Sequence, residues 1–385
     1  IFDPIHGYIE LSKLAISIID TPEFQRLRNI KQLGCCYYVF PGASHNRFEH
    51  SIGVAYLARK LLRNILKNQS EIKINKAFLD IIEIAGLCHD LGHGPFSHIF
   101  DDKFLKAHIK NNSFIKHEIR SCLILDYIVK KYNIKISKPH LEIIKELIHP
   151  IKKNIKPKFL YHIVANPDTG IDVDKFDYIR RDTYNIGLKY SFNYDRIIKQ
   201  ARVINDEIVY PSKMIYEIYE LFNIRNRLHL QIYTHPVVRA VELMYIDCFN
   251  ILEKKCNFSK KILNIEEFLK YTDTIFEKFI HIKEIKHILQ RIDKREIYKY
   301  VGQDLIITDL EEDIILKKAQ KIFKKLFSNK AKKTYFDIVT IGYKENPIKK
   351  VKFYSTKTNK LVNMSNISNL INQNLFEQKI RFYKN

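Results

Sequence analysis

A mainly α-helical fold with a small α+β C-terminal lobe is the class that this sequence predicts. Over the first two thirds of the 385 residues, apolar side chains recur at the spacing of one-sided helices. After about residue 256 the helices become richer in Lys, and stretches of β-branched and aromatic residues follow. We therefore expect residues 1–255 to form the main domain. Residues 256–385 are expected to form an α+β lobe that packs on it and takes part in oligomerisation.

The helical pattern is strongest in the segments 48–62, 80–91, 193–203 and 216–233. Residues 262–289 are also expected to be helical. Residues 335–343 and 351–354 have strand composition and are separated by the turn-like segment 344–347, which predicts a small antiparallel sheet.

Composition narrows the class of protein. With 46% hydrophobic residues the chain can bury a substantial core, and 65 Lys and Arg against 43 Asp and Glu give a net charge of +22. That excess predicts an anionic partner, such as a nucleic acid, a nucleotide or a membrane surface. No run of about 18 uncharged apolar residues is present, so no membrane-spanning segment is expected. Six cysteines are too few for a disulfide scaffold and favour an intracellular location. The first residue is not Met and no signal peptide follows, so we expect a fragment or a processed form.

Histidine and aspartate concentrate in four segments: 45–50, 89–98, 117–118 and 172–175. His89 and Asp90 end an apolar stripe, so both are placed at the C-terminal end of a buried helix. Buried neighbours of this kind are costly unless they are paired or bind a metal. Together with His50 and Asp174 they make a mixed nitrogen and oxygen set that suits a divalent ion: Fe, Mn, Ni, Zn or Mg. Taken alone, the His89–Asp90 pair could instead be a core histidine beside a helix end.

Three further histidines, His93, His98 and His117, are candidates for proton transfer, because imidazole titrates near neutral pH. For each of them singly, an ordinary surface or core histidine is the alternative.

The ordered set His50, His89-Asp90 and Asp174 resembles the motif of the HD-domain phosphohydrolases. Segments 3–7, 19–28, 40–50, 85–98 and 170–177 resemble, more narrowly, the deoxynucleoside triphosphate triphosphohydrolases. The similarity is greatest to the animal members that carry a sterile-alpha-motif domain, which this sequence lacks. It extends over nearly the whole chain. The resemblance implies an HD-domain helical fold and cleavage of dNTPs, dGTP included, to deoxynucleoside and inorganic triphosphate. It also implies a nuclear or cytoplasmic enzyme that regulates dNTP pools.

The same resemblance implies roles for individual residues. The metal would be held by His50, His89, Asp90 and Asp174. His117 matches the general acid, His98 and Asp101 belong to the same relay, and His93 matches a contact to the α-phosphate. The matching substrate-binding residues are the phosphate clamp Arg47, Lys175 and Arg225, the sugar contacts Gln32, Leu33, Asp182 and Tyr233, and the pocket-wall residues Tyr178, His229 and His235.

An effector site between subunits is a further implication. In the family, guanine nucleotide and dNTP bind there and drive assembly, so a homo-oligomer, either a dimer or a tetramer, is expected. The matching residues are Asp20, Gln25 and Arg28 for the guanine, and Arg196, Lys213, Arg295 and Lys299 for the effector phosphates. Phe2, Gln200, Pro211 and Pro236 depart from the residue types expected there.

Two alternatives remain, one within enzymes and one from another class of protein. One is an HD phosphohydrolase or nuclease that acts on other nucleotides or on single-stranded nucleic acid. The other is a nucleic-acid-binding protein with a vestigial HD site, which would use the +22 charge and the 23 Tyr and 24 Phe for binding and base stacking. The complete set of metal ligands favours an active enzyme.

Overall fold

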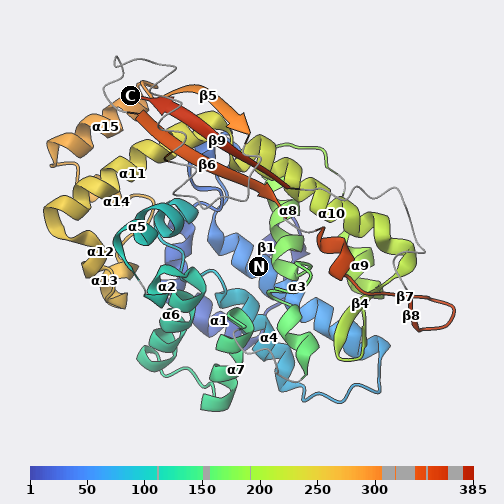
Figure 1. Cartoon of the computed structure of the whole chain (residues 1–385). Helices are drawn as coiled ribbons and strands as arrows, with labels where there is room; N and C mark the ends of the chain where they lie inside the picture. The colour runs from blue at the N-terminus through green and yellow to red at the C-terminus, as the bar shows by residue number, and fades with distance from the viewer. Residues whose placement is uncertain are drawn as a thin grey trace.

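A computed structural model describes residues 1–110, 112–150, 157–190, 192–305, 317, 334–343, 346–362 and 376–385, and it confirms a mainly helical fold with small C-terminal sheets (Figure 1). The helices are α1 (Lys13–Ile19), α2 (Pro22–Gln25), α3 (Arg47–Asn68), α4 (Ala77–Cys88), α5 (Lys106–His108), α6 (His117–Lys131), α7 (Lys138–Ile148), α8 (Val173–Asn185), α9 (Tyr194–Gln200), α10 (Ile215–Leu228), α11 (Pro236–Cys256), α12 (Phe258–Lys261), α13 (Ile265–Leu269), α14 (Ile275–Lys278) and α15 (Lys283–Asp293). The strands are β1 (Phe2–Asp3), β2 (Gly7–Tyr8), β3 (Arg202–Ile204), β4 (Glu207–Pro211), β5 (Lys299–Leu305), β6 (Thr334–Gly342), β7 (Phe353–Tyr354), β8 (Leu361–Val362) and β9 (Phe376–Lys384).

Three helices, α3, α4 and α8, form the centre of the molecule. Two glycines let their neighbours approach closely. A Cβ on Gly53 of α3 would lie 2.0 Å from Asp177 Oδ1 of α8, and one on Gly92 would lie 2.0 Å from the His117 carbonyl oxygen at the start of α6. Any side chain at either position would push these elements apart. The chain therefore brings α3 against α8, and α6 against the turn after α4.

Side chains define where the central helices begin. Asn46 caps α3 in a capping box, in which its side chain accepts from backbone amides and Glu49 Oε1 accepts from the Asn46 amide at 3.0 Å. Asp172 caps α8 by accepting from the Lys175 amide at 3.1 Å. Since His50 lies in the first turn of α3 and Asp174 in the first turn of α8, these caps also fix where both side chains start.

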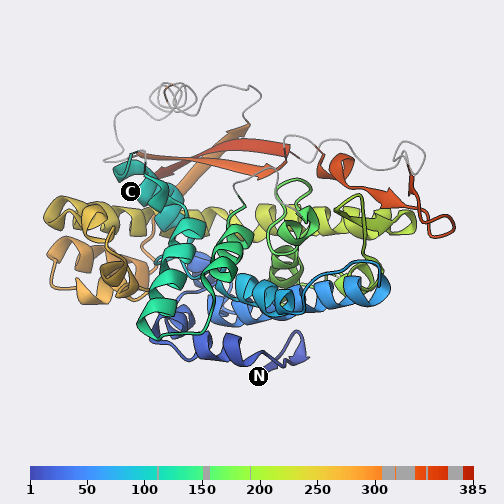
Figure 2. The ribbon, with the colours of Figure 1, turned by 90° about the horizontal axis from the view of Figure 1, so that it is seen from below.

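Strands from the C-terminal region belong to two sheets. In the first, β9 lies between β5 and β6 and is antiparallel to both. Figure 2 shows this sheet over one side of the helical layer and the N-terminal segment on the other. The second sheet has the order β3-β4-β7-β8, with β4 and β7 parallel.

Several predicted elements need correction. The predicted strands 335–343 and 351–354 are β6 and β7, but they belong to different sheets and do not pair with each other. Residues 262–289 form α13, α14 and the start of α15, because the intervening Asp273 bonds the backbone amides of Lys31 and Phe96 instead of continuing a helix. The predicted helix 193–203 ends at Gln200, since Arg202–Ile204 pairs with β4. The predicted helix 216–233 changes after Leu228 into a π-helix, His229–Tyr233.

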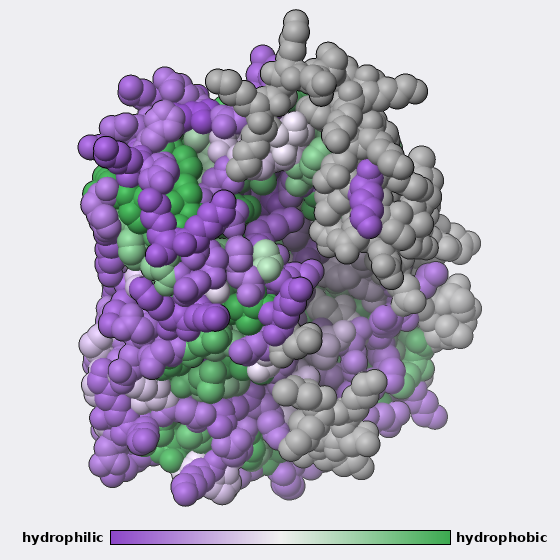
Figure 3. Space-filling model, turned by 60° about the vertical axis from the view of Figure 1, so that its left-hand side comes forward, coloured by the Kyte–Doolittle hydropathy of each residue, from purple (hydrophilic) through white to green (hydrophobic). Residues whose placement is uncertain are grey.

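A single hydrophobic cluster runs from the N-terminal helices to the C-terminal strands and includes Phe24, Phe104, Phe249, Phe268 and Tyr383. It crosses residue 256, where a domain boundary remains a prediction. On the face drawn in Figure 3, apolar residues form separate patches among hydrophilic ones. Among the described residues, no helix is both long enough and apolar enough to cross a membrane.

A buried ion cluster joins the C-terminal sheet to the helical layer. Asp337 of β6 is 1% exposed and accepts from Arg239 Nε of α11 at 2.7 Å. Lys103 Nζ lies 3.4 Å from the same carboxylate, and Arg239 also pairs with Glu242. Lys103 belongs to the π-helix Ile99–Leu105, which also carries Asp101.

Asp337→Ala should lower the free energy of unfolding by about 3 kcal/mol, because it leaves Arg239 buried with one anionic partner fewer. Urea denaturation measures the change. Asp304→Ala is the control, since Asp304 is exposed on β5 of the same sheet and should change stability by less than about 0.5 kcal/mol. Equal effects of the two substitutions would contradict a stabilising role of the buried cluster.

Candidate active site

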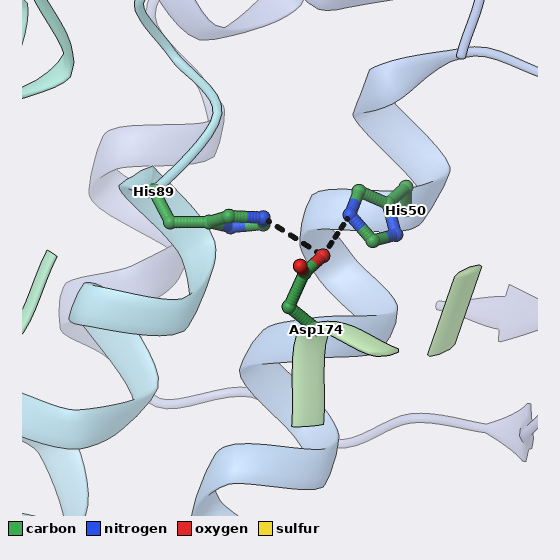
Figure 4. Close-up of side chains that lie close together, drawn as sticks. All are labelled: His50, His89 and Asp174. Carbon is green, nitrogen blue, oxygen red and sulfur yellow. Dashed lines mark ion pairs between the residues drawn. The ribbon is translucent and has the colours of Figure 1, made fainter. Parts of the chain in front are cut away.

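Three helices bring His50, His89 and Asp174 together. His50 comes from α3, His89 follows the last residue of α4, and Asp174 comes from α8, with its carboxylate between the two imidazole rings (Figure 4). Asp174 Oδ1 lies 3.1 Å from His50 Nε2 and 3.5 Å from His89 Nε2. Asp90 adds its carboxylate 3.3 Å from His89 Nε2 and 3.6 Å from His50 Nε2.

Hydrogen bonds on the far side of each ring determine which nitrogen faces the site. His50 Nδ1 lies 2.7 Å from Asp177 Oδ2, and His89 Nδ1 lies 2.8 Å from the Gly86 carbonyl oxygen. Both Nε2 atoms are buried without a hydrogen-bond partner. Two orphaned imidazole nitrogens that point at two carboxylates fit a divalent cation with mixed nitrogen and oxygen ligands.

The electrostatics of the cluster also favour a cation. Burial lowers the pKa of His50, but the neighbouring carboxylates of Asp174 and Asp177 outweigh it and raise that pKa to about 10. For Asp174, burial raises the pKa and the two histidines lower it, with a net shift well below the ordinary value. The carboxylates thus stay ionised and can serve as anionic ligands of a cation.

Asp177 connects the cluster to the N-terminal segment. Its Oδ1 lies 2.6 Å from His6 Nε2, and it accepts from Arg181 Nε at 2.8 Å. Arg181 Nη1 donates to Asp3 Oδ2 at 2.9 Å, and Tyr194 Oη lies 2.9 Å from His6 Nδ1. Both carboxylate oxygens of Asp177 therefore have hydrogen-bond partners, which hold the carboxylate in place. The carboxylate in turn holds the His50 ring in one orientation.

A second group lies beside the first and contains His93, His117 and Asp101. The rings of His93 and His117 stack at 3.9 Å, and Asp101 Oδ2 lies 3.4 Å from His117 Nδ1. Asp101 Oδ1 pairs with the buried Arg120, which also donates to the Gly92 carbonyl oxygen at 2.7 Å. His93 Nε2 lies 3.4 Å from Asp90, so the two groups are adjacent.

His98 lies at the edge of this group. Its ring is 5.3 Å from that of His93 and 6.1 Å from that of His117, and its side chain is 68% exposed. Its ion-pair partner is Asp102, at 3.7 Å, and not the buried Asp101. His98 is thus open to solvent, whereas His93 is enclosed.

A strained turn places Arg47. Phe96 and Ser97 both have φ of 58°, a conformation that bulky residues rarely adopt. It is imposed by Asp273, which accepts from the Phe96 amide at 2.6 Å, and by the Phe96 ring, which stacks on Tyr245 at 4.2 Å. The turn presents Ser97 Oγ to Arg47 Nε at 2.9 Å, while Arg47 Nη1 pairs with Asp90.

Several residues predicted to surround the sugar lie around Asp182. Tyr233 Oη donates to Asp182 Oδ2 at 2.5 Å, and His45 Nε2 lies 2.7 Å from Asp182 Oδ1. Gln32 Oε1 is buried without a partner. The half-buried Leu33 follows Gln32 and precedes a 3₁₀ helix, Gly34–Tyr38.

His229 and His235 are two further predicted pocket residues. His229 contacts Tyr233, whereas His235 lies at the start of α11. The rings of His229 and Tyr233 meet edge to face at 5.0 Å, and burial, assisted by Arg225, lowers the pKa of His229 to about 3. His235 caps α11 and accepts from the Val237 amide at 3.2 Å, so its side chain has a structural partner.

Two cations, Lys175 of α8 and Arg225 of α10, belong to the predicted phosphate clamp. Lys175 Nζ donates to both Asp172 oxygens, at 2.9 and 3.2 Å. Arg225 Nε donates to Tyr178 Oη at 3.2 Å, while its Nη1 is buried without a partner. Lys175 is therefore already paired, whereas Arg225 has a free donor.

The predicted effector residues lie in three separate places. Gln25 and Arg28 bond each other at 2.7 Å next to Asp20, and the Arg28 guanidinium lies 3.5 Å over the Phe48 ring. Arg196 pairs with Glu217 on α10, close to Lys213 in the preceding turn. Arg295 donates to the Tyr38 carbonyl oxygen at 2.9 Å, and Lys299 begins β5. Nothing in the described part of the chain joins the three groups.

Sequence reasoning missed the residues that orient the site: Asp177, His6, Arg120 and His45. Asp177 lies three residues after Asp174, and Arg120 three after His117, so helical spacing from a predicted ligand was the available signal. His6 is 171 residues from Asp177, so spacing gives no signal for it, although it lies in segment 3–7, which resembles the triphosphohydrolases.

Comparison with known proteins agrees with this geometry. The family model of the HD domain matches residues 47–182, and that of the HD-associated region matches residues 192–378. The fold and site thus define an HD-domain phosphohydrolase.

Individual relatives narrow the class. Human deoxynucleoside triphosphate triphosphohydrolase SAMHD1 is 37% identical over 99% of this chain and 69% of its own length. A putative HD domain-containing protein of Acanthamoeba polyphaga mimivirus is 36% identical over 91% of this chain and 83% of its own. A SAMHD1 homolog of Dictyostelium discoideum is 37% identical over 80% of this chain and 60% of its own. The chain belongs to the SAMHD1 family of HD-domain phosphohydrolases.

Asp177→Asn should weaken binding of Mn²⁺ roughly tenfold to a hundredfold, because an amide oxygen holds the His50 ring less firmly than a carboxylate. Isothermal titration calorimetry on metal-free protein measures the affinity without reference to turnover.

Asp3→Asn is the matched control for this substitution. It also removes a carboxylate from Arg181, but it leaves the bond between Asp177 and His50 intact. Its Mn²⁺ affinity should stay close to that of the wild type. If both variants lose the same affinity, the effect comes from Arg181 and not from orientation of His50.

Proposed function

We propose that this chain is a metal-dependent deoxynucleoside triphosphate triphosphohydrolase that releases deoxynucleoside and inorganic triphosphate. The observation that carries the proposal is the pair of buried, unpartnered Nε2 atoms of His50 and His89, which point at the carboxylates of Asp90 and Asp174. These four residues would hold the ion. A divalent ion there supplies Lewis-acid polarisation of the phosphoryl group and lowers the pKa of water.

The neighbouring histidine group supplies the proton that the leaving oxygen needs. As water attacks the α-phosphorus, a P–O bond forms and the bond to the 5′-oxygen breaks. We assign the proton donor to His117, whose Nδ1 faces Asp101 at 3.4 Å and whose Nε2 lies 3.8 Å from the Glu118 carboxylate. Arg120 in turn holds Asp101, and the stacked His93 ring lies between His117 and Asp90. His98 would act from the solvent edge of the same relay.

Two groups of residues would bind the substrate, one its phosphates and the other its sugar. Lys175 and Arg225, with Arg47 at the opposite side, would bind the phosphates, since guanidinium and ammonium groups pair well with phosphate oxygens. Gln32 and Asp182 would hold the 3′-hydroxyl. Tyr233, fixed by its bond to Asp182, and Leu33 would pack against C2′ and exclude a ribose hydroxyl.

Regulation is part of the proposal. A guanine nucleotide would bind at Asp20, Gln25 and Arg28, and the exposed cations of the other two groups would contact effector phosphates from a second copy of the chain. A complete effector site would then combine groups from more than one copy of the chain in a homo-oligomer. The human relative's name supports the dNTP substrate but says nothing of effectors.

Product analysis tests the proposal. Metal-loaded protein incubated with dGTP should give deoxyguanosine and triphosphate in equal amounts, resolved by ion-exchange chromatography. Asp174→Ala should abolish turnover, because it removes a proposed ligand of the ion, and it also serves as the control for contaminating phosphatases.

Other products would contradict the proposal. Formation of dGMP and pyrophosphate would mean that the bond between the α- and β-phosphates breaks, and not the bond to the 5′-oxygen. Cleavage of a labelled single-stranded oligonucleotide without dNTP turnover would favour the nuclease alternative.

A further inference from the structure

Tyr343 brings the C-terminal region into the phosphate pocket. It follows the last residue of β6, in the part of the chain that matches the HD-associated region. The Arg225 guanidinium lies over its ring at 4.8 Å, and Phe222 meets the ring edge to face at 5.7 Å. These contacts with Arg225 and Phe222 of α10 hold the Tyr343 ring in place, so its hydroxyl has a defined direction.

The hydroxyl reaches the N-terminal end of α8. A Cβ placed on Gly170 would lie 3.5 Å from Tyr343 Oη and 3.9 Å from Lys175 Cε, so these two groups flank the same point. Gly170 has φ of +68° and precedes the cap of α8. The first turn of this helix carries Asp174 and Lys175, and a helix N-terminus favours negative charge.

Two hydrogen-bond donors in this pocket lack acceptors. Tyr343 Oη and Arg225 Nη1 are both buried and make no hydrogen bond. A buried donor without an acceptor is destabilising, and two of them beside Lys175 call for an anionic acceptor with several oxygens. A polyphosphate chain has that chemistry.

We propose that the Tyr343 hydroxyl donates a hydrogen bond to the phosphate chain of the substrate, beside Arg225 and Lys175. The proposal rests on the proposed function in so far as the substrate is a nucleoside triphosphate. It assigns to the C-terminal region a direct contact with substrate, which the sequence motifs did not indicate.

The test is Tyr343→Phe, which removes only the hydroxyl and keeps the ring under Arg225. Binding of inorganic triphosphate, added as its magnesium salt to metal-loaded protein, should weaken roughly tenfold, as expected for loss of a hydrogen bond to a charged group. The affinity for deoxyguanosine should not change. In turnover, KM for dGTP should rise by a similar factor while kcat changes little, because the contact serves binding.

Tyr335→Phe is the matched control, because Tyr335 lies on the same strand and its hydroxyl bonds Asp247 away from the pocket. It should leave triphosphate affinity unchanged. Equal affinity of wild type and Tyr343→Phe would overturn the inference while leaving the proposed function intact. If the wild-type protein itself fails to bind inorganic triphosphate, both the inference about Tyr343 and the proposed function are contradicted. A loss shared by triphosphate and deoxyguanosine would mean that Tyr343 only supports the fold.

Discussion

The bond between His50 and the buried carboxylate of Asp177 is the interaction on which the rest of the site depends. Without it, the His50 ring could rotate and its Nε2 would no longer face Asp174. Asp177 itself is held by His6 and Arg181, which come from the N-terminal segment and from α8. Gly53 is required because any side chain there would occupy the position of this carboxylate. One buried anion thus determines how α3, α8 and the first residues of the chain fit together.

The C-terminal region is tied to the same site from the opposite side. Asp337 reaches Arg239 on α11 and Lys103 on the π-helix that carries Asp101, so the sheet contacts the segment proposed to orient the proton donor. Tyr343, at the end of the same strand, lies under Arg225. The two matched family segments therefore both contribute to the proposed active site. Most of the +22 charge lies outside it, and the pocket accounts for only a few of the 65 basic residues.

The sequence alone predicted helices with regular apolar spacing and residues that belong to an ordered motif. The helices at 48–62 and 80–91 were predicted because their apolar spacing is regular, and His50, His89, Asp90 and Asp174 because ligand types cluster in an ordered motif. Strand pairing was not predictable in the same way: β6 pairs with β9 across a long separation, whereas its neighbour in sequence, β7, joins β4. Periodicity also could not show that Asp273, between α13 and α14, bonds two distant amides.

In the proposed reaction, water attacks the α-phosphorus next to His50, His89, Asp90 and Asp174 while His117 protonates the departing 5′-oxygen. Hydrolysis of dGTP in water enriched in ¹⁸O tests this most directly, with mass spectrometry of both products. One ¹⁸O atom is expected in the inorganic triphosphate and none in deoxyguanosine, because water attacks phosphorus and the bond between phosphorus and the 5′-oxygen breaks. Label in the 5′-hydroxyl of deoxyguanosine, or in a nucleoside phosphate, would contradict it.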